Sequence, residues 1–462
     1  MMRTFMQKAV LGMAFLLTPL SLMAAEFSAE NLAQAKALAE KAGKSELAYQ
    51  LDESLSTEVG PRRVGTPGDK AGIEWAVAKM KALGFDRVWT ETVTTPGWER
   101  GDISVEAVSP FPQRMVAIAL GGSVPTPADG IEAQVVAFPN LDALKAAEAG
   151  SLKGKIAYIG YQMKPSIDGA DYGVAGKQRY LGSEVAASKG ASAVLIRSVG
   201  TDNDRIGHTG AQGDKSTIPA AALSIPDADL LESMMKRSDK VTLKINISSR
   251  KTADVKTANV IGEVTGTERP EDFVVLGSHL DSWDVGTGAV DDGMGVAITM
   301  AAAKHIIDSG KKPKRSIRVI LFGAEEIGLY GVKQYYEKHK DKLGNHIIGA
   351  EWDSGTRMIH QLRPGVGEKS LAAIKQMAEL LKPYGVALHP SNSAKGQSDI
   401  SVLGKAGMPA INFDSDLTDY FDYHHTENDT MANVPPETMR QASAVYTAFA
   451  WLTANSLIDF RK

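Results

Sequence analysis

The second half of the chain alternates short apolar runs with helical stretches. After Lys251, the apolar runs 273–277, 316–322, 346–352 and 409–413 are each followed by a helical stretch, at 295–307, 332–338, 369–381 and 437–457. Strands that alternate with helices are typical of an α/β domain in which helices cover both faces of a sheet. We therefore predict an α/β fold for residues 250–462.

The first half of the chain divides into two regions with different secondary-structure patterns. Helical stretches at 28–43, 45–55 and 70–83 lie within residues 26–115, which we assign to the same main domain. Residues 116–249 instead carry short β-rich runs separated by Gly, Pro and Asp, with one helical stretch at 182–189. This pattern predicts a small inserted α+β unit. Its one histidine, His208, is assigned no chemistry, because a lone histidine is usually a surface or packed residue.

Residues 1–25 have the pattern of a secretory signal peptide. Arg3 and Lys8 precede an apolar run over 9–23, and the small residues Ala24 and Ala25 follow it. A membrane-spanning helix needs about 20 apolar residues, and Pro19 interrupts this shorter run. We therefore expect export to the periplasm or the medium, with no membrane attachment after cleavage.

Charge and cysteine content exclude several classes of function. The formal net charge of -4, without a run of Lys and Arg, makes nucleic acid an unsuitable partner. The chain has no cysteine, which excludes both a disulfide framework and metal sites built from thiolates. A metal site in this chain must use histidine and carboxylate ligands.

Histidine and acidic residues gather where the predicted strands end. His279 follows the first of these strands, Glu325 and Glu326 follow the second, and Asp353 follows the third. In open α/β sheets the ligand crevice lies beyond the carboxyl ends of the strands, so these side chains are predicted to converge on one cleft.

Adjacent carboxylates are usually solvated surface pairs, which is the alternative interpretation of both Asp291–Asp292 and Glu325–Glu326. The second pair, however, follows the apolar run 317–322 with only Gly323 and Ala324 between. Two neighbouring carboxylates at the end of a buried strand repel each other unless cations compensate their charge. The context therefore favours a metal site.

The segment 277–295 is the most specific stretch of the sequence. In His279-x-Asp281 the carboxylate can accept the second N–H of the imidazole while the other nitrogen binds a metal. A P-loop, a dinucleotide fingerprint and the His-Glu-x-x-His helix of single-zinc proteases are all absent from the sequence. Carboxylate-rich chemistry with two metals is the metallohydrolase option that is left.

At these positions the sequence resembles the co-catalytic zinc exopeptidases, in particular the carboxypeptidase Q (plasma glutamate carboxypeptidase) family and its bacterial relatives. The resemblance is specific at 277–295, 324–326, 351–355 and 423–430. It implies a mixed sheet sandwiched between helices. It also implies that the insertion is a protease-associated domain, because 153–157 and 218–221 are similar to recurring phrases of that domain.

The resemblance implies two Zn²⁺ ions per chain and a role for each matching residue. One zinc would be held by His279 and Asp353 and the other by Glu326 and His425, with Asp291 bridging them. Glu325 would be the general base, and Asp281 would be a second catalytic residue that orients His279. His425 is preferred to His424 because the family's ligand directly precedes Thr or Ser. The bond between Asp291 and Asp292 would be a cis peptide. The residues concerned are His279, Asp281, Asp291, Asp292, Glu325, Glu326, Asp353, His424 and His425.

The expected substrates are dipeptides or short peptides cut from a free end. Trp283, Ser398, Asp399 and His424 are predicted to line the cleft, although a packed aromatic residue and a loop cap are equally good interpretations of Trp283 and of Ser398–Asp399. The resemblance also suggests a homodimer. Two alternatives remain open: an inactive, receptor-like binding protein of the same fold, and a single-zinc glutaminyl cyclase.

Overall fold

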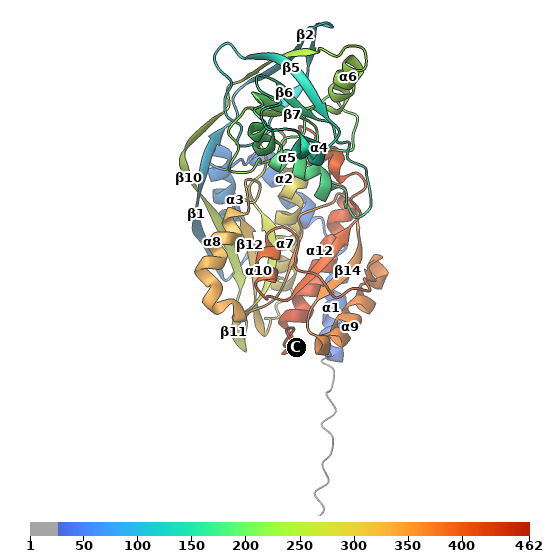
Figure 1. Ribbon diagram of the computed structural model, residues 1–462. Helices are drawn as coiled ribbons and strands as arrows, with labels where there is room; N and C mark the ends of the chain where they lie inside the picture. Colours follow the sequence, from blue (N-terminus) through green and yellow to red (C-terminus); the bar gives the residue numbers. More distant parts are fainter. Residues whose placement is uncertain (1–25) are drawn as a thin grey trace, which may run out of the picture.

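Two eight-stranded β-sheets organise residues 26–462, the part of the chain that the computed structural model describes (Figure 1). The predicted signal peptide, residues 1–25, lies outside the described residues. The first sheet, with the helices packed on it, is called the main unit; its strands in spatial order are β1 (Arg87–Glu99), β10 (Arg250–Val264), β12 (Arg315–Phe322), β11 (Arg269–His279), β13 (His346–Glu351), β16 (Ala410–Ser415), β14 (Ile359–Gly365) and β15 (Ala387–Leu388).

The second sheet and its helices are called the second unit. Its strands in spatial order are β3 (Gln113–Met115), β2 (Ile103–Ser109), β9 (Thr242–Ile247), β5 (Ile131–Phe138), β6 (Ile156–Ile159), β7 (Ala193–Arg197), β8 (Ala220–Leu223) and β4 (Ala117–Ala119). Its helices are α4 (Leu141–Ala146), α5 (Tyr172–Ser188) and α6 (Ile225–Met235). The sequence predicted a single helix here, at 182–189; that prediction was incomplete, because α5 begins ten residues earlier and α4 and α6 lie outside it.

The sheet of the main unit is mixed. Strands β12, β11, β13 and β16 are parallel neighbours, whereas β10 runs antiparallel to β12 and β14 runs antiparallel to β16. The parallel strands bring their carboxyl ends to one edge of the sheet, which is where a site is expected in this architecture. The predicted α/β fold with a mixed sheet is confirmed.

Alternate residues of the central strands pack against helices on opposite faces of the sheet. On β11, Val274 and Leu276 join a core that includes α7 (Met294–Ile307) and α12 (Pro436–Ala454). Phe273 and Val275 point to the other face, where α8 (Tyr330–His339) and α10 (Ile400–Lys405) lie. Successive side chains of a strand point to opposite faces, and a strand covered on both sides is apolar at nearly every position. This explains the continuous apolar runs in the sequence.

Five further helical elements complete the face that α7 and α12 cover: α1 (Ala29–Ala42), α2 (Leu47–Glu58), α3 (Pro67–Leu83), α9 (Leu371–Leu381) and the turn η1 (Ala289–Gly293). Helix α7 is buried along nearly its whole length, because Ala, Val, Ile and Met occupy all of its sides. It places η1, which directly precedes it, at the carboxyl end of β11.

The strands and helices predicted after Lys251 correspond to β11, β12, β13 and β16 and to α7, α8, α9 and α12, so these predictions are confirmed. Strands β1, β10, β14 and the two-residue β15 were missed. The first half of β10 is exposed and polar, and Pro96–Gly97 interrupts the pairing of β1 with it, so neither strand has the apolar run of a buried strand.

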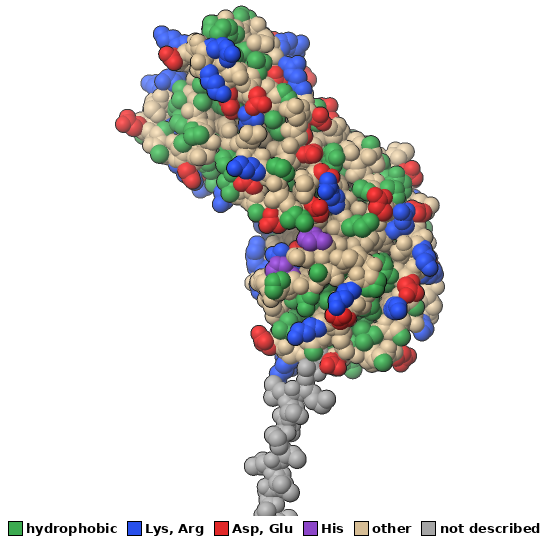
Figure 2. All heavy atoms as spheres, turned by 90° about the vertical axis from the view of Figure 1, so that its right-hand side faces the viewer, with side chains coloured by type: hydrophobic (Ala, Val, Ile, Leu, Met, Phe, Trp, Pro, Cys, Tyr) green, Lys and Arg blue, Asp and Glu red, His purple; other side chains and the backbone are tan. Residues whose placement is uncertain are grey.

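The second unit forms the upper lobe in Figure 1, and the molecule narrows between the two lobes in Figure 2. On the face shown in Figure 2, acidic and basic side chains are interspersed. The lobes meet where residues 201–212 contact residues 421–428; the backbone N–H of Thr209, for example, donates to the carbonyl of His425 at 3.0 Å. None of the described helices is both long enough and apolar enough to cross a membrane.

Candidate metal centre

Four of the predicted metal ligands line one cavity of about 490 Å³ between the two units: Asp291, Glu326, Asp353 and His425. His279 is the last residue of β11, Asp291 lies in η1, and Asp353 follows the end of β13. Glu325 and Glu326 follow β12, and His425 follows the short helix α11 (Tyr420–Tyr423). The structure therefore brings together five side chains that come from separate segments of the main unit: His279, Asp291, Glu326, Asp353 and His425.

Asp291 is the centre of this group. Its Oδ1 lies 3.1 Å from Nε2 of His279, and its Oδ2 lies 3.5 Å from Nε2 of His425. Nε2 of His279 is also 3.4 Å from Oδ1 of Asp353, and Nε2 of His425 is 2.9 Å from Oε2 of Glu326. One carboxylate thus faces a histidine on each side, and each histidine faces a further carboxylate. The peptide bond between Asp291 and Asp292 is cis, as the resemblance implied.

Burial disfavours negative charge on two carboxylates of this cluster, whereas the hydrogen bond and charge of His279 outweigh burial and lower the pKa of Asp291. Burial, together with the charge of Asp291, raises the pKa of Glu326 well above its ordinary value. Burial also raises the pKa of Asp353. Burial lowers the pKa of His425 well below its ordinary range, so its ring is held in the neutral form that binds metals. The cluster therefore has ligand atoms in a state that a bound cation would stabilise.

An oxygen of Glu326 that has no partner is further evidence for a cation site. Its Oε1 is buried and has no hydrogen-bond partner among the described residues. A buried carboxylate oxygen without a partner is costly, because it has lost its hydration without a replacement. Oxygen and imidazole nitrogen atoms grouped around such an atom fit a zinc site with an open position.

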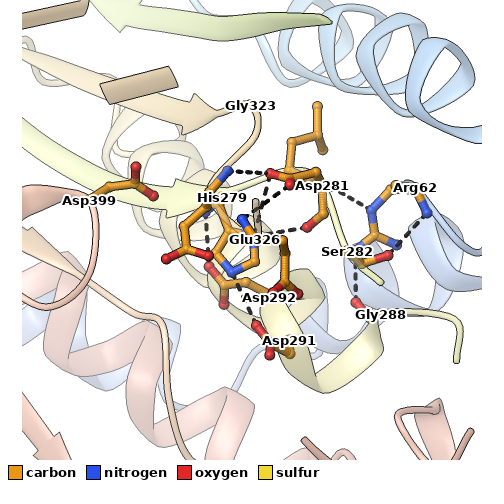
Figure 3. A network of polar contacts seen from close by, with 12 residues as sticks. Arg62, His279, Asp281, Ser282, Gly288, Asp291, Asp292, Gly323, Glu326 and Asp399 are labelled. Atoms are coloured by element: carbon orange, nitrogen blue, oxygen red, sulfur yellow. Dashed lines mark hydrogen bonds and ion pairs between the residues drawn. The ribbon is translucent and has the colours of Figure 1, made fainter. Parts of the chain in front are cut away.

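The ring of His279 is oriented by the backbone rather than by a carboxylate. Its Nδ1 lies 2.8 Å from the carbonyl oxygen of Asp281, whereas the Asp281 carboxylate is 3.8 Å away. The predicted contact with that carboxylate was therefore wrong. The carboxylate instead accepts the backbone N–H of Glu325 at 3.0 Å and that of Glu326 at 3.3 Å. Figure 3 shows Asp281 beside Glu326. Asp281 holds the turn that carries both glutamates.

Glu325 lies at the edge of the cavity and is partly exposed. Its Oε1 accepts a hydrogen bond from the hydroxyl of Ser398. Burial raises the pKa of Glu325 to about 8. The Ser398 hydroxyl binds only Oε1, so Oε2 of Glu325 can exchange a proton with a molecule in the cavity.

The remaining predicted residues have different surroundings. Ser398 and His424 line the cavity, but Asp399 is fully buried and does not. Trp283 is also buried, and its ring packs 5.8 Å from the ring of His425, centre to centre. It lines a neighbouring cavity of about 250 Å³. The ring of His424 is stacked on that of His425 at 3.6 Å.

Sequence reasoning missed several residues that support the cluster. The carboxylate of Asp292 accepts the backbone N–H of His279 at 3.1 Å, and the side-chain oxygen of Gln397 accepts that of Asp353 at 3.0 Å. Glu351 accepts the N–H groups of Asp399 and Ile400. Two of these residues lie within the motifs already recognised: Asp292 directly follows Asp291, and Glu351 lies two residues before Asp353, so their closeness to a ligand was a usable signal.

Two further residues come from the second unit. His208 and Arg179 reach the segment that carries His424 and His425. His208 is fully buried, with Nδ1 3.0 Å from the carbonyl oxygen of His424 and Nε2 2.8 Å from Asp202. No motif in the sequence connects either residue with the site.

Comparison with known proteins places this chain in a family. A family model described as Peptidase family M28 matches residues 259–450. Carboxypeptidase Q of Rattus norvegicus is 35% identical over 410 residues, which cover 88% of this chain and 85% of that protein. The matched region includes all five residues of the cluster.

Solved structures agree with the sequence comparison. The crystal structure of a peptidase M28 precursor from Shewanella amazonensis SB2B superposes with a TM-score of 0.91 at 46% identity, covering 94% of this chain and 98% of that one. A zinc aminopeptidase from Bacillus subtilis shares the fold, with a TM-score of 0.65 at 20% identity over 90% of this chain and 96% of that one. The chain therefore belongs to peptidase family M28 and is a metallopeptidase.

Proposed function

We propose that this protein is an exported exopeptidase that uses two zinc ions to hydrolyse dipeptides or short peptides from a free end. The observation that carries the proposal is the position of Asp291, whose two oxygens face a histidine on either side. A single carboxylate in that position is suited to bridge two cations. The zinc aminopeptidase of Bacillus subtilis, which has the same fold, supports zinc as the metal.

In this proposal His279 and Asp353 would hold one zinc, Glu326 and His425 would hold the other, and Asp291 would be shared. His425 is preferred to His424, because its Nε2 is closer both to Asp291, at 3.5 Å against 3.7 Å, and to the carboxylate of Glu326. Each zinc would have three protein ligands, which leaves a position for water or substrate. Bound zinc would polarise the scissile carbonyl and lower the pKa of water.

Glu325 would act as the general base and acid. Its carboxylate would take a proton from the attacking water and deliver that proton to the nitrogen of the leaving amine. The hydroxyl of Ser398 donates to Oε1 of Glu325 and orients this side chain. The backbone N–H of Glu325 donates to the carboxylate of Asp281, which fixes the turn that carries Glu325. Asp281 is therefore a positioning residue for Glu325 in this mechanism.

The shape of the site supports action on short substrates. The cavity holds about 490 Å³ and is walled by both units, so a long folded chain would not pass through it. The names of the relatives, a carboxypeptidase and an aminopeptidase, are both those of enzymes that cut at a chain end.

We further propose that the second unit is a protease-associated domain, that residues 1–25 direct export to the periplasm or the medium, and that the enzyme forms a homodimer. The second unit supports the first assignment, because it carries the segments 153–157 and 218–221 and forms one wall of the cavity. Sizing of the mature protein by light scattering tests the dimer.

Zinc content and a substrate panel test the function. Purified enzyme should bind close to two zinc ions per chain and hydrolyse dipeptides, with loss of activity when one terminus is blocked. Zinc near one per chain with cyclisation of N-terminal glutamine would favour the cyclase alternative. Zinc near zero without turnover would favour the inactive binding protein.

The shared position of Asp291 has its own test. Asp291→Asn removes the charge that faces both histidines, so the variant should lose most of its zinc at both positions. Asp308→Asn, at the end of α7, changes the same kind of side chain far from the cluster and is the matched control. An Asp291→Asn variant with two tightly bound zinc ions would exclude the bridging role.

A further inference from the structure

Arg179 is a buried cation that lines the cavity of the metal centre. It comes from α5 of the second unit and is 9% exposed. The cavity wall also contains Asp291, Glu325, Glu326 and Asp353. Among the described residues that line this cavity, Arg179 is the one Lys or Arg side chain. It therefore supplies the positive charge that this part of the wall offers to a substrate.

The partners of Arg179 within the protein are all neutral. Its Nη2 donates to the hydroxyl of Tyr172 at 2.6 Å, and its Nη1 donates to the carbonyl of Thr209 at 3.4 Å. No carboxylate of the described chain forms an ion pair with it. Nη1 also lies 3.4 Å from Nδ1 of His425, so the guanidinium adjoins the metal centre.

Other buried arginines of the protein have fuller sets of partners: Arg62 donates to four backbone carbonyl oxygens, and two others pair with carboxylates. Arg197 pairs with Asp229 and Glu232, and Arg318 pairs with Glu263 at 2.8 Å. Buried charges are costly unless they are paired. An anion bound in the cavity would therefore stabilise Arg179, which is nine-tenths buried. Within the described residues that anion is absent, and the cavity is the place from which a ligand could supply it.

The donors of the site fit a carboxylate. A guanidinium has five N–H groups; the bond to Tyr172 leaves one N–H on Nη2, and Nε also has no partner among the described residues. The hydroxyl of Tyr172 accepts from Arg179, so its own hydrogen is available to donate. Its ring is stacked on Phe421 at 4.8 Å and meets the edge of His424 at 5.2 Å, which fixes the hydroxyl in place. A planar, forked donor of this kind matches the two oxygens of a carboxylate.

The backbone makes room for the guanidinium. Gly210 has a φ of +133°, and a Cβ at that position would lie 2.5 Å from Nε and Cζ of Arg179. A residue with a side chain could not occupy this position without displacing Arg179. The local fold of the second unit is therefore built around the guanidinium.

We propose that Arg179, with the hydroxyl of Tyr172, binds the free α-carboxylate of the substrate. The inference rests on the proposed function and narrows it: the enzyme cleaves substrates whose carboxyl terminus lies next to the scissile bond, as in a dipeptide. Because the guanidinium adjoins the ring of His425, a carboxylate bound there lies within about one or two residues' length of the metal centre, at roughly 3.5 Å per residue. The leaving group is then the carboxy-terminal residue.

The test compares leucyl-alanine with leucyl-alanine amide, which differ only at the carboxyl terminus, where a neutral amide replaces the charged carboxylate. The zinc-loaded wild type should prefer the free acid. Arg179→Met keeps the length of the side chain and removes the charge, so kcat/KM for the free acid should fall about 10- to 100-fold, mainly through KM, while that for the amide stays nearly constant. Arg237→Met, on the exposed surface of the same unit, is the control and should change neither value.

Tyr172→Phe is the second variant, because it removes one hydroxyl and retains the packed ring. It should lower kcat/KM for the free acid by about 3- to 10-fold and leave kcat/KM for the amide unaffected. If Arg179→Met loses zinc, the result for Tyr172→Phe tests the carboxylate site in its place. Equal losses on both substrates, or a wild type that hydrolyses both equally well, would overturn the role of Arg179. A zinc-loaded wild type that hydrolyses neither substrate would instead overturn the proposed function.

Discussion

His208 of the second unit lies with its Nδ1 3.0 Å from the backbone carbonyl of His424 in the main unit. The other ring nitrogen contacts Asp202 at 2.8 Å, so the ring is held from both sides. The next residue, His425, has a φ of +61°, in the left-handed region that residues other than glycine rarely adopt. The second unit therefore helps to hold the turn that presents His425 to the metal centre.

This relationship predicts that a residue of the second unit influences metal binding. His208→Leu removes both ring contacts, so the turn at 424–425 should loosen. We expect weaker binding of one zinc, with content after dialysis falling from about two toward about one, and a fall in kcat of about 10- to 100-fold. Zinc analysis by atomic emission, with kinetics measured in added zinc, checks this. His389→Leu, which follows β15, is the control, and unchanged zinc content in His208→Leu would contradict the prediction.

The role of Asp281 gives a second prediction. Since the ring of His279 is oriented by a backbone carbonyl, Asp281→Asn should leave that orientation intact and retain zinc. In the wild type the two oxygens of Asp281 each accept one N–H, that of Glu325 or that of Glu326. In asparagine one of these oxygens becomes an NH₂ group, which cannot accept, so one N–H loses its partner. Misplacement of Glu325 should lower kcat about 10- to 100-fold.

Zinc titration and steady-state kinetics on the same Asp281→Asn preparation separate the two effects. Loss of zinc with normal kcat at saturating zinc would instead indicate that the carboxylate orients His279. Asp272→Asn provides a comparison, because Asp272 contacts Arg269 and Arg315 at the opposite end of β11.

A third prediction concerns Glu325. Glu325→Gln keeps the size of the side chain and removes the proton acceptor, so kcat should fall about 100- to 10,000-fold while zinc content stays near wild type. Ser398→Ala removes only the hydrogen bond to Oε1 and should cause a smaller fall. Glu337→Gln, on the exposed side of α8, is the control. Near-normal turnover by purified Glu325→Gln would exclude Glu325 as the base.

The sequence was sufficient to predict the part of the site that the main sheet creates. His279, Glu326 and Asp353 end or follow strands that are parallel and adjacent, and parallel strands bring such residues to one edge whatever the details of packing. The same rule predicted the helices on both faces, because the apolar runs of β11 and β12 require cover on each side.

Contacts that depend on how the two units meet could not be predicted in this way. Arg179 and His208 lie in segments without a recognisable motif, and their importance follows from the docking of residues 201–212 against 421–428. The hydrogen-bond partner of the His279 ring could not be predicted from the sequence either. A spacing of two residues brings both the carbonyl and the carboxylate of Asp281 near the ring, and only the path of the backbone decides between them.

Two buried histidines far from the metal centre predict how stability depends on pH. Burial lowers the pKa of His305, on α7, to about 4 and the pKa of His346, at the start of β13, to about 3. Between these values and the ordinary histidine pKa of about 6.5, the unfolded chain binds protons that the folded protein does not. The free energy of unfolding should therefore fall as pH decreases below about 6.5, by as much as about 1.4 kcal/mol per pH unit for each histidine.

His305→Leu isolates one of these contributions, since Nε2 of His305 has no hydrogen-bond partner among the described residues. The free energy of unfolding of the wild type, minus that of the variant, should decrease by about 2 kcal/mol between about pH 7 and about pH 5. Urea unfolding at several pH values measures this difference. Met300→Leu, in the same helix, removes no titratable group, so its difference from the wild type should not depend on pH. If the two variants showed the same pH dependence, His305 would have to gain its proton as readily in the folded protein as in the unfolded chain, and the desolvation of its ring by α7 and its neighbours would not govern its titration.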